Sequence, residues 1–266
     1  MSNIIAFPMY DIFRPATQAF GAALQNILVQ KGLPARSLTL AWPQGDLLSH
    51  WRRDDLLLSQ TCGYPLVTRL PEVQILGCFH YQAPGCEGFS YRSVLVARQG
   101  DKQKTLVDFR GRRAVCNAVD SQSGYNALLK MVAPLAHHGG FFAAAAISGS
   151  HRESLQAIAQ GTADIAAIDC VTWALLQRYE PALLRGLAVI GQSPLAPGLP
   201  LITARQTPPQ TVRLLRDALR QLVSEPEYRA LCAALLITRF SEVRREAYSA
   251  LLAWRQEAIL NGVTQL

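Results

Sequence analysis

Two serines and a glycine stand between an apolar run and a segment of helical spacing in the stretch "AVCNAVDSQSGYNALLKM", residues 114–131. Apolar residues recur there at helical intervals, so a helix is predicted to begin within "DSQSG". The first turn of a helix exposes unpaired N–H groups and about half a positive charge, and nearby serine hydroxyls donate further hydrogen bonds to an oxyanion. Ser121, Ser123 and the N–H of Gly124 are therefore candidate anion ligands. The alternative is that Ser121 or Ser123 only caps the helix, a role that serine often fills.

Two more helices are predicted to begin with polar residues. In "SGSHRESLQAI", Ser150 and Glu153 have the spacing of a capping box, which leaves His151 unexplained. His151 is either an exposed first-turn residue or a hydrogen-bond donor to the ligand. Asp169 directly follows the predicted strand "ADIAAID", where it either caps the next helix or points a carboxylate into a crevice.

These residues are placed by strands that alternate with helices along the chain. The predicted strands lie near residues 3–9, 37–42, 56–60, 73–81, 112–117, 141–148, 163–169 and 186–192. Such alternation is typical of an α/β protein with mostly parallel sheets and helices on both faces. Crevices at the carboxyl ends of the strands are where such sheets bind ligands, and the serine stretch lies at one of these ends.

The order of elements predicts two lobes. Lobe 1 is expected to contain residues 1–92 and 198–266, and lobe 2 residues 93–197. The carboxyl-terminal helices, near 208–224, 226–236 and 241–260, are expected to pack back on lobe 1. Two crossovers would then form a hinge, and a ligand bound in the cleft between the lobes would close them.

Composition narrows the class of protein. The chain has 26 Lys and Arg, 19 Asp and Glu and a net charge of +7, but its basic residues are scattered, which argues against nucleic-acid binding. Six cysteines are dispersed without zinc-site spacing, so neither a metal nor a cofactor is expected. The start "MSNIIAFPMYD" does not resemble a secretory signal, and no apolar stretch is long enough for membrane insertion. The chain as written is expected to be cytosolic, or else to lack its export signal.

The segments "LVDFRGRRAVCNAVDSQSGYNALL" and "GSHRESLQAIAQGTADIAAIDCVTWALL" resemble the second lobe of the phosphate, phosphite and phosphonate substrate-binding proteins of ABC transporters. These proteins form the phosphonate-binding branch of the type 2 periplasmic binding proteins. The matching motif residues are Leu106, Asp108, Phe109 and Gly111, followed by Ser121, Gln122, Ser123 and Gly124. In addition, "YRSVLVAR" resembles the first crossover strand of the family.

The resemblance implies a two-lobed fold, a periplasmic location, a partner permease and a phosphonate-type ligand held by the S-x-SG turn. It also implies that Asp169 lines the cleft, where a carboxylate suits an amine or hydroxyl of the ligand. By position, Tyr10, Gln60 and Thr61 of the first lobe would face the same cleft, although Tyr10 also fits an ordinary half-buried aromatic residue. Two features depart from the family: Gln122 is larger than the usual small hydroxyl residue, and Asp120 adds a negative charge beside the turn.

The sequence therefore predicts a solute-binding protein for a small oxyanion and not an enzyme. One alternative is a cytosolic enzyme on the same fold that uses His151 with Cys62 or Cys170. The other is a module that senses a ligand and reports it to a signalling partner, an alternative that the missing signal sequence favours.

Overall fold

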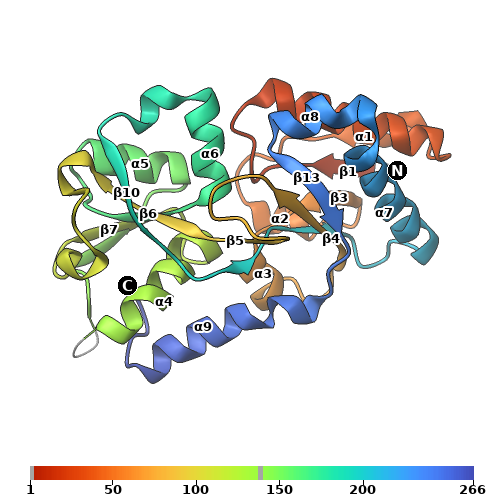
Figure 1. Ribbon diagram of the computed structural model, residues 1–266. Helices are drawn as coiled ribbons and strands as arrows, with labels where there is room; N and C mark the ends of the chain where they lie inside the picture. Colours follow the sequence, from red (N-terminus) through yellow and green to blue (C-terminus); the bar gives the residue numbers. More distant parts are fainter. Residues whose placement is uncertain (1–2, 137–139) are drawn as a thin grey trace. The chain divides into compact units, whose positions relative to one another are not determined.

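The computed structural model describes residues 3–136 and 140–266, and the chain divides into two compact units (Figure 1). Unit 1 comprises Met1–Gln82 and Pro197–Tyr248, and unit 2 comprises Ala83–Ala196 and Ser249–Leu266. Residues 83–92 and 249–266 thus lie in unit 2, whereas the sequence prediction placed them in lobe 1. The chain passes between the units at three points, of which the third precedes the last helix.

Unit 1 is built on a mixed sheet. Within the described residues this sheet has six strands, in the order β13-β4-β12-β3-β1-β2. The strands are β1 (Asn3–Ala6), β2 (Leu38–Leu40), β3 (Leu56–Gln60), β4 (Gln74–Tyr81), β12 (Pro200–Thr203) and β13 (Ile237–Ser241). β1 is parallel to β2 and β3, whereas β12 is antiparallel to β3 and β4, and β13 is antiparallel to β4.

Helices cover the sheet of unit 1. α1 (Arg14–Gln30), α7 (Pro209–Ser224) and α8 (Arg229–Ala234) contact one another beside the sheet, and α2 (Leu47–Trp51) and α3 (Gly63–Thr68) lie on its other side (Figure 1). Phe20, Leu24 and Leu219 are fully buried in the core between α1, α7 and the strands. Short 3-10 segments complete the unit at Ala35–Ser37, Pro226–Tyr228 and Arg245–Tyr248.

Unit 2 contains smaller sheets. Its strands are β5 (Ser90–Tyr91), β6 (Ser93–Arg98), β7 (Arg113–Cys116), β8 (Ala144–Ile147), β9 (Ala166–Asp169) and β10 (Leu187–Gln192), and β5 pairs with β11 (Ala196–Pro197). β6 runs antiparallel to β9 and β10, while β7 is parallel to β8 and is bridged to Ile165, just before β9.

The helices of unit 2 are α4 (Ala127–Val132), α5 (His151–Ala159), α6 (Cys170–Tyr179) and α9 (Ser249–Leu260), with 3-10 segments at Gln99–Asp101, Leu106–Phe109, Ala133–Leu135 and Pro181–Leu184. The 3-10 segment Leu106–Phe109 explains the family motif around Asp108. The backbone N–H and side-chain hydroxyl of Thr105 both donate to the Asp108 carboxylate, at 2.8 and 3.0 Å. Phe109 is buried in the core, and Gly111 has φ of +69°, a left-handed conformation that favours glycine. These residues build the entry to β7.

The predicted α/β fold is confirmed, but the sheets are mixed and not mostly parallel. The predicted strands and helices are largely present, because apolar periodicity is a local property. In unit 1 the antiparallel pairings come from β12 and β13, because each runs antiparallel to every strand with which it pairs. β13 was missed because its residues, "ITRFS", lie between the predicted helices 226–236 and 241–260, in a tail that was expected to contain no strand.

The last helix lies in unit 2, whereas the sequence prediction placed residues 249–266 in lobe 1. Ala258 and Val263 are buried against Leu129 and Ala133 of the α4 region. Apolar burial therefore draws α9 onto α4.

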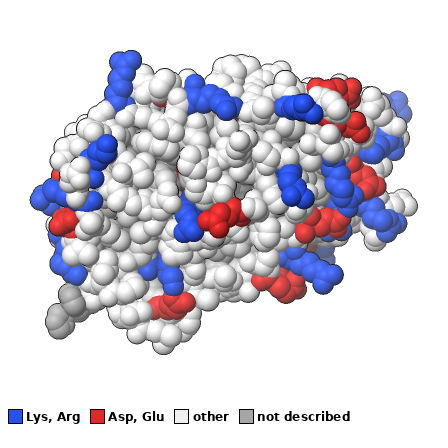
Figure 2. Space-filling view, in the orientation of Figure 1, with Lys and Arg blue, Asp and Glu red and all other residues white. Residues whose placement is uncertain are grey.

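Charged side chains are dispersed over the face seen in Figure 2, where acidic and basic groups lie interspersed. Many of them pair, as Arg220 does with Glu242 and Arg92 with Glu87. This is the scattered pattern that the sequence predicted. Among the described residues, none of the helices has the length and apolar character that crossing a membrane requires.

Candidate functional site

The serine stretch forms a short π-helical turn that leads into α4. β7 ends at Cys116, and the turn spans Gln122–Asn126 with Ser121 as its N-cap. The N–H of Asn126 donates to the carbonyl oxygen of Ser121 at 3.0 Å, five residues back. Single π-helical turns are frequent at functional sites. The helix therefore begins within "DSQSG", as predicted.

Ser121 caps this turn. Its hydroxyl oxygen accepts a hydrogen bond from the N–H of Gly124 at 3.0 Å. That N–H, which the sequence nominated as an anion ligand, is thus engaged within the protein. Gln122 is almost fully buried, and its side-chain oxygen accepts from the Asn126 amide at 3.3 Å. The hydroxyl of Ser123, by contrast, faces another element, α5.

Ser123 and His151 meet across unit 2. The Ser123 hydroxyl lies 2.9 Å from Nε2 of His151, which is the first residue of α5. Nδ1 of the same ring is buried without a hydrogen-bond partner. If Nε2 carries the ring proton, it donates to Ser123 and leaves the hydroxyl proton unused; if Nδ1 carries it, the Nδ1–H is unused. In either tautomer one donor of the pair is left unused within the protein.

Burial keeps His151 neutral. Desolvation lowers the pKa of its imidazole from 6.5 to about 4, because a charged ring loses its hydration in this environment. The site therefore offers hydrogen-bond donors and no imidazolium charge at neutral pH. Ser150 caps α5 by accepting from the N–H of Glu153 at 3.1 Å, which is one of the two hydrogen bonds of the predicted capping box.

The lowered pKa of His151 predicts a stability that falls in mild acid. The unfolded chain binds the proton near pH 6.5 and the folded chain only near pH 4, so unfolding is favoured as the pH drops between these values. Between pH 7 and 5, the wild type should lose about 2 kcal/mol more unfolding free energy than His151→Gln. Urea unfolding at each pH measures the difference, and parallel losses in the two proteins would contradict it.

Asn117, in the segment between β7 and this turn, was missed in the sequence. Its side-chain Oδ1 is buried without a partner, and a Cβ added to Gly124 would lie 2.0 Å from it. Glycine at position 124 therefore leaves the space that the Asn117 amide occupies. Its position directly after the last residue of β7 was the one feature of the sequence that could have indicated Asn117.

Asp169 is a helix cap in this structure. It is buried at the end of β9, and its Oδ1 accepts from the N–H groups of Val171 and Thr172 at 2.8 and 3.1 Å. The first of the two predicted roles is thus present.

Tyr10 and Gln60 meet in unit 1, at the carboxyl ends of β1 and β3. Both line a small cavity of about 20 Å³ together with Thr17, Tyr81 and apolar side chains. The Gln60 amide donates to the Tyr81 hydroxyl at 2.9 Å, and the rings of Tyr10 and Tyr81 are 5.1 Å apart, edge to face. Two of the three residues nominated in the first lobe are therefore brought together.

Thr61 is fully buried and does not line this cavity, although its hydroxyl has no hydrogen-bond partner. Thr17, on α1, was missed in the sequence; its buried hydroxyl is also without a partner and borders the cavity. Thr17 was hidden because it lies within an ordinary amphipathic helix.

A larger cavity of about 390 Å³ lies at the opposite edge of the same sheet, where β3 and β4 begin. Its basic side chains are largely held by neighbours: Arg52 donates to the carbonyl oxygen of Arg69, and Arg205 pairs with Glu72. We place the candidate site at the carboxyl edge because ligands bind there in α/β sheets. No group of three or more potential metal ligands occurs among residues 3–136 and 140–266.

Comparison with known proteins identifies the class of fold. PhnD1 from Prochlorococcus marinus, solved with methylphosphonate, superposes with a TM-score of 0.78 at 14% identity over 98% of this chain and 99% of that one. A binding protein component of an ABC phosphonate transporter from Pseudomonas aeruginosa gives 0.75 at 19% identity, over 98% and 87%. XAC2383 from Xanthomonas citri, solved with ATP, gives 0.70 at 14% identity, over 98% of each chain. The fold is thus that of the two-lobed solute-binding proteins.

The family follows from the sequence match. Residues 55–248 match the periplasmic phosphonate substrate-binding proteins of ABC transporters, and the chain belongs to this family. A comparison with curated protein sequences finds no match. The structural relatives share less than 25% identity with this chain, and two of them were solved with different ligands. They therefore establish the fold and leave the ligand open.

Proposed function

We propose that this chain is the periplasmic binding component of an ABC importer and captures a phosphonate or a related phosphorus oxyanion. Family membership supports a role in binding and delivery to a permease, not in catalysis. A relative of the same fold was solved with methylphosphonate, which supports the ligand class.

The Ser123–His151 pair carries the proposal. It keeps one unused donor at the N-terminus of α5, and Ser123 lies in the first turn of the helical segment 122–132. Two helix N-termini therefore contribute their positive ends to one place, which favours an anion. Neutral donors suit a tetrahedral oxyanion with several acceptor oxygens, and Ser121 and Gly124 hold the turn in shape.

The remainder of the ligand is proposed to be recognised by Asp169, Tyr10 and Gln60, and not by Thr61, which is fully buried away from the cavity. A carboxylate suits an amine or hydroxyl substituent, as in an aminoalkyl phosphonate. Gln60 and Tyr10 border a cavity with room for about one water, so they suit a small substituent.

Ligand binding should raise the melting temperature, because a ligand that binds only the folded state stabilises it. Phosphate, phosphite, methyl- and aminoethylphosphonate, sulfate and small carboxylates are screened by thermal shift, and the best is measured by calorimetry. Ser123→Ala should weaken its binding by about 10- to 100-fold, since a hydrogen bond to a charged group contributes roughly 1.5–3 kcal/mol.

Ser224→Ala is the matched control, because Ser224 ends α7 on the surface of unit 1 and bonds only within its own helix. This variant should bind as the wild type does. The proposal fails if none of the anions raises the melting temperature, or if Ser123→Ala binds the best ligand with unchanged affinity.

A further inference from the structure

Two cysteines that are far apart in the sequence touch in unit 2. The Sγ atoms of Cys86 and Cys170 are 3.6 Å apart, although 84 residues separate them. Cys86 lies half-buried in the loop after β4, and Cys170 is the buried first residue of α6. A disulfide bond is about 2.05 Å long, so joining them needs an approach of about 1.5 Å.

The loop holds Cys86 in this position. Gly85 has φ of +101°, and a Cβ added to it would lie 3.2 Å from Cβ of Cys170, so the glycine permits the close approach. Cys86 donates its N–H to the carbonyl oxygen of Ala83 at 3.0 Å, and Glu87 and Ser90 exchange two backbone hydrogen bonds of 2.9 Å. Backbone hydrogen bonds therefore fix the conformation of this loop and hold the Cys86 thiol next to the Cys170 thiol.

The other end of the contact is equally fixed. The N–H of Cys170 donates to the carbonyl oxygen of Arg92 at 3.1 Å, and the preceding residue, Asp169, caps α6. Two of the remaining cysteines, Cys78 and Cys232, are buried and direct their thiols at the backbone carbonyl oxygens of Phe79 and Leu222. Cys86 and Cys170 thus differ from these two in facing a second thiol.

We propose that Cys86 and Cys170 form a disulfide under oxidising conditions and that this bond ties the loop after β4 to the N-terminus of α6. The oxidant is a disulfide, either of a thiol oxidoreductase or of a small molecule. The inference rests on the proposed function only in placing the chain in the periplasm, where such oxidants act.

The exchange proceeds in two steps. Cys86, the more exposed thiol, loses its proton and attacks the oxidant's disulfide, which forms a mixed disulfide and releases one thiolate. Cys170 then loses its proton and attacks Sγ of Cys86, which forms the Cys86–Cys170 bond and releases the second thiolate. Two thiols are oxidised, and one disulfide is reduced to two thiols. The pKa of the Cys170 thiol is raised by its hydrogen bond with Cys86 and by burial, which makes Cys170 the resolving thiol and not the first nucleophile.

The test compares the full chain after treatment with oxidised glutathione and after reduction. Oxidation should remove two of the six thiols counted in denaturant and produce a peptide crosslinked between positions 86 and 170 in mass spectra. Closing so long a loop should raise the melting temperature by roughly 5–10 °C. Cys86→Ser and Cys170→Ser should each abolish the crosslink and the gain, whereas Cys232→Ser should retain both.

Two results would overturn the inference: six thiols that persist after oxidation, or glutathione that remains on Cys86 without exchange to Cys170. If Cys170→Ser does not fold, the half-buried Cys86→Ser decides the matter alone. The outcome is separable from the ligand proposal, because a chain that binds no anion can still form the crosslink, and a chain that binds phosphonate can still lack it.

Discussion

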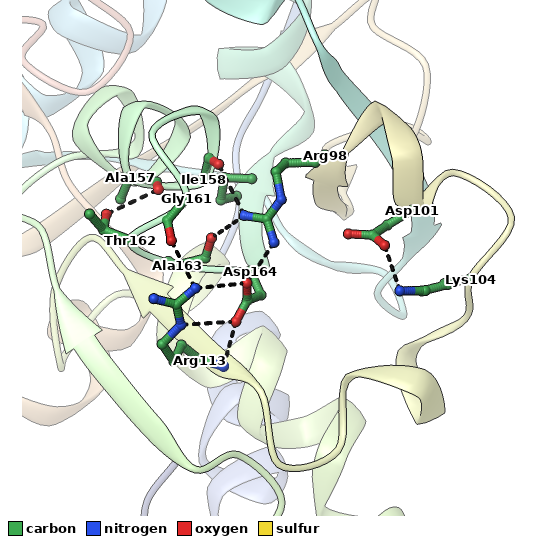
Figure 3. Close-up of polar contacts among 10 residues, drawn as sticks. All are labelled: Arg98, Asp101, Lys104, Arg113, Ala157, Ile158, Gly161, Thr162, Ala163 and Asp164. Carbon is green, nitrogen blue, oxygen red and sulfur yellow. Dashed lines mark hydrogen bonds and ion pairs between the residues drawn. The ribbon is translucent and has the colours of Figure 1, made fainter.

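Asp164→Asn is expected to lower the free energy of unfolding by about 3 kcal/mol, because it removes a buried carboxylate and leaves two guanidinium groups without their counter-charge. Asp164 is nearly buried and receives hydrogen bonds from Arg98 at 2.6 Å and from Arg113 at 3.0 and 3.1 Å (Figure 3). Its Oδ2 also accepts the backbone N–H of Arg113. The cluster joins β6 and β7 to the segment before β9, and therefore joins the strand that leads to the serine turn to the one that ends in Asp169.

The same cluster predicts an acid dependence. Hydrogen bonds from Arg113 and Arg98 lower the pKa of Asp164 far below its usual value, so its stabilisation is complete above about pH 4 to 5 and declines as the pH falls further. Wild type and Asp164→Asn should therefore differ by a constant amount at neutral pH and converge in acid. Urea unfolding between pH 7 and 3 measures this.

Asp101→Asn is the matched control, since Asp101 pairs with Lys104 at the surface of the same unit (Figure 3). Exposed pairs contribute about 0–1 kcal/mol, so this substitution should change little. Equal losses in the two variants would show that the buried position of Asp164 has no special role.

Gly124→Ala is expected to lower the free energy of unfolding by about 2–3 kcal/mol and to weaken anion binding by roughly 100-fold or more. The new methyl group would lie 2.0 Å from Oδ1 of Asn117 and 3.2 Å from Oγ of Ser121. Both side chains must move, and Ser121 is the cap that shapes the turn carrying Ser123. Chemical unfolding and calorimetry with the best ligand of the panel report the two effects.

Two controls separate this clash from a general effect of alanine. Gly100→Ala, in an exposed 3-10 segment of the same unit, meets no atom within 4 Å and should be neutral. Adding Asn117→Ala to Gly124→Ala should recover part of the stability, because the second substitution removes the obstructing amide. A double variant no more stable than Gly124→Ala would refute the steric explanation.

Local elements were predictable to within a few residues. A helix begins directly after Asp169, as predicted, and the serine turn begins where its polar residues indicated. The family motif from Leu106 to Gly111 was recognised from residue identity alone. The structure then showed that Asp108 caps a 3-10 segment, that Phe109 is buried in the core, and that Gly111 adopts a left-handed conformation. Apolar spacing and capping depend on residues that are only a few positions apart, so the helices and turns that they form can be predicted from the sequence.

The spacing of apolar residues along the chain could not predict which distant segments pair or pack together. β13 was not predicted, the sheets were taken as mostly parallel, and residues 249–266 were assigned to lobe 1. Strand direction in a sheet depends on which distant segment offers free backbone groups, and the side on which a helix packs depends on where an apolar surface remains uncovered.

The sequence alone therefore determined the α/β class, the family and the serine turn as the place to look for an anion. Only the tertiary structure decided what each residue does there: Ser121 and Asp169 serve as caps, Ser123 meets His151, and Cys86 meets Cys170. The physical reason is that a cap bonds to its own neighbours in the chain, whereas the Ser123–His151 and Cys86–Cys170 contacts are made by residues that folding brings together from far apart.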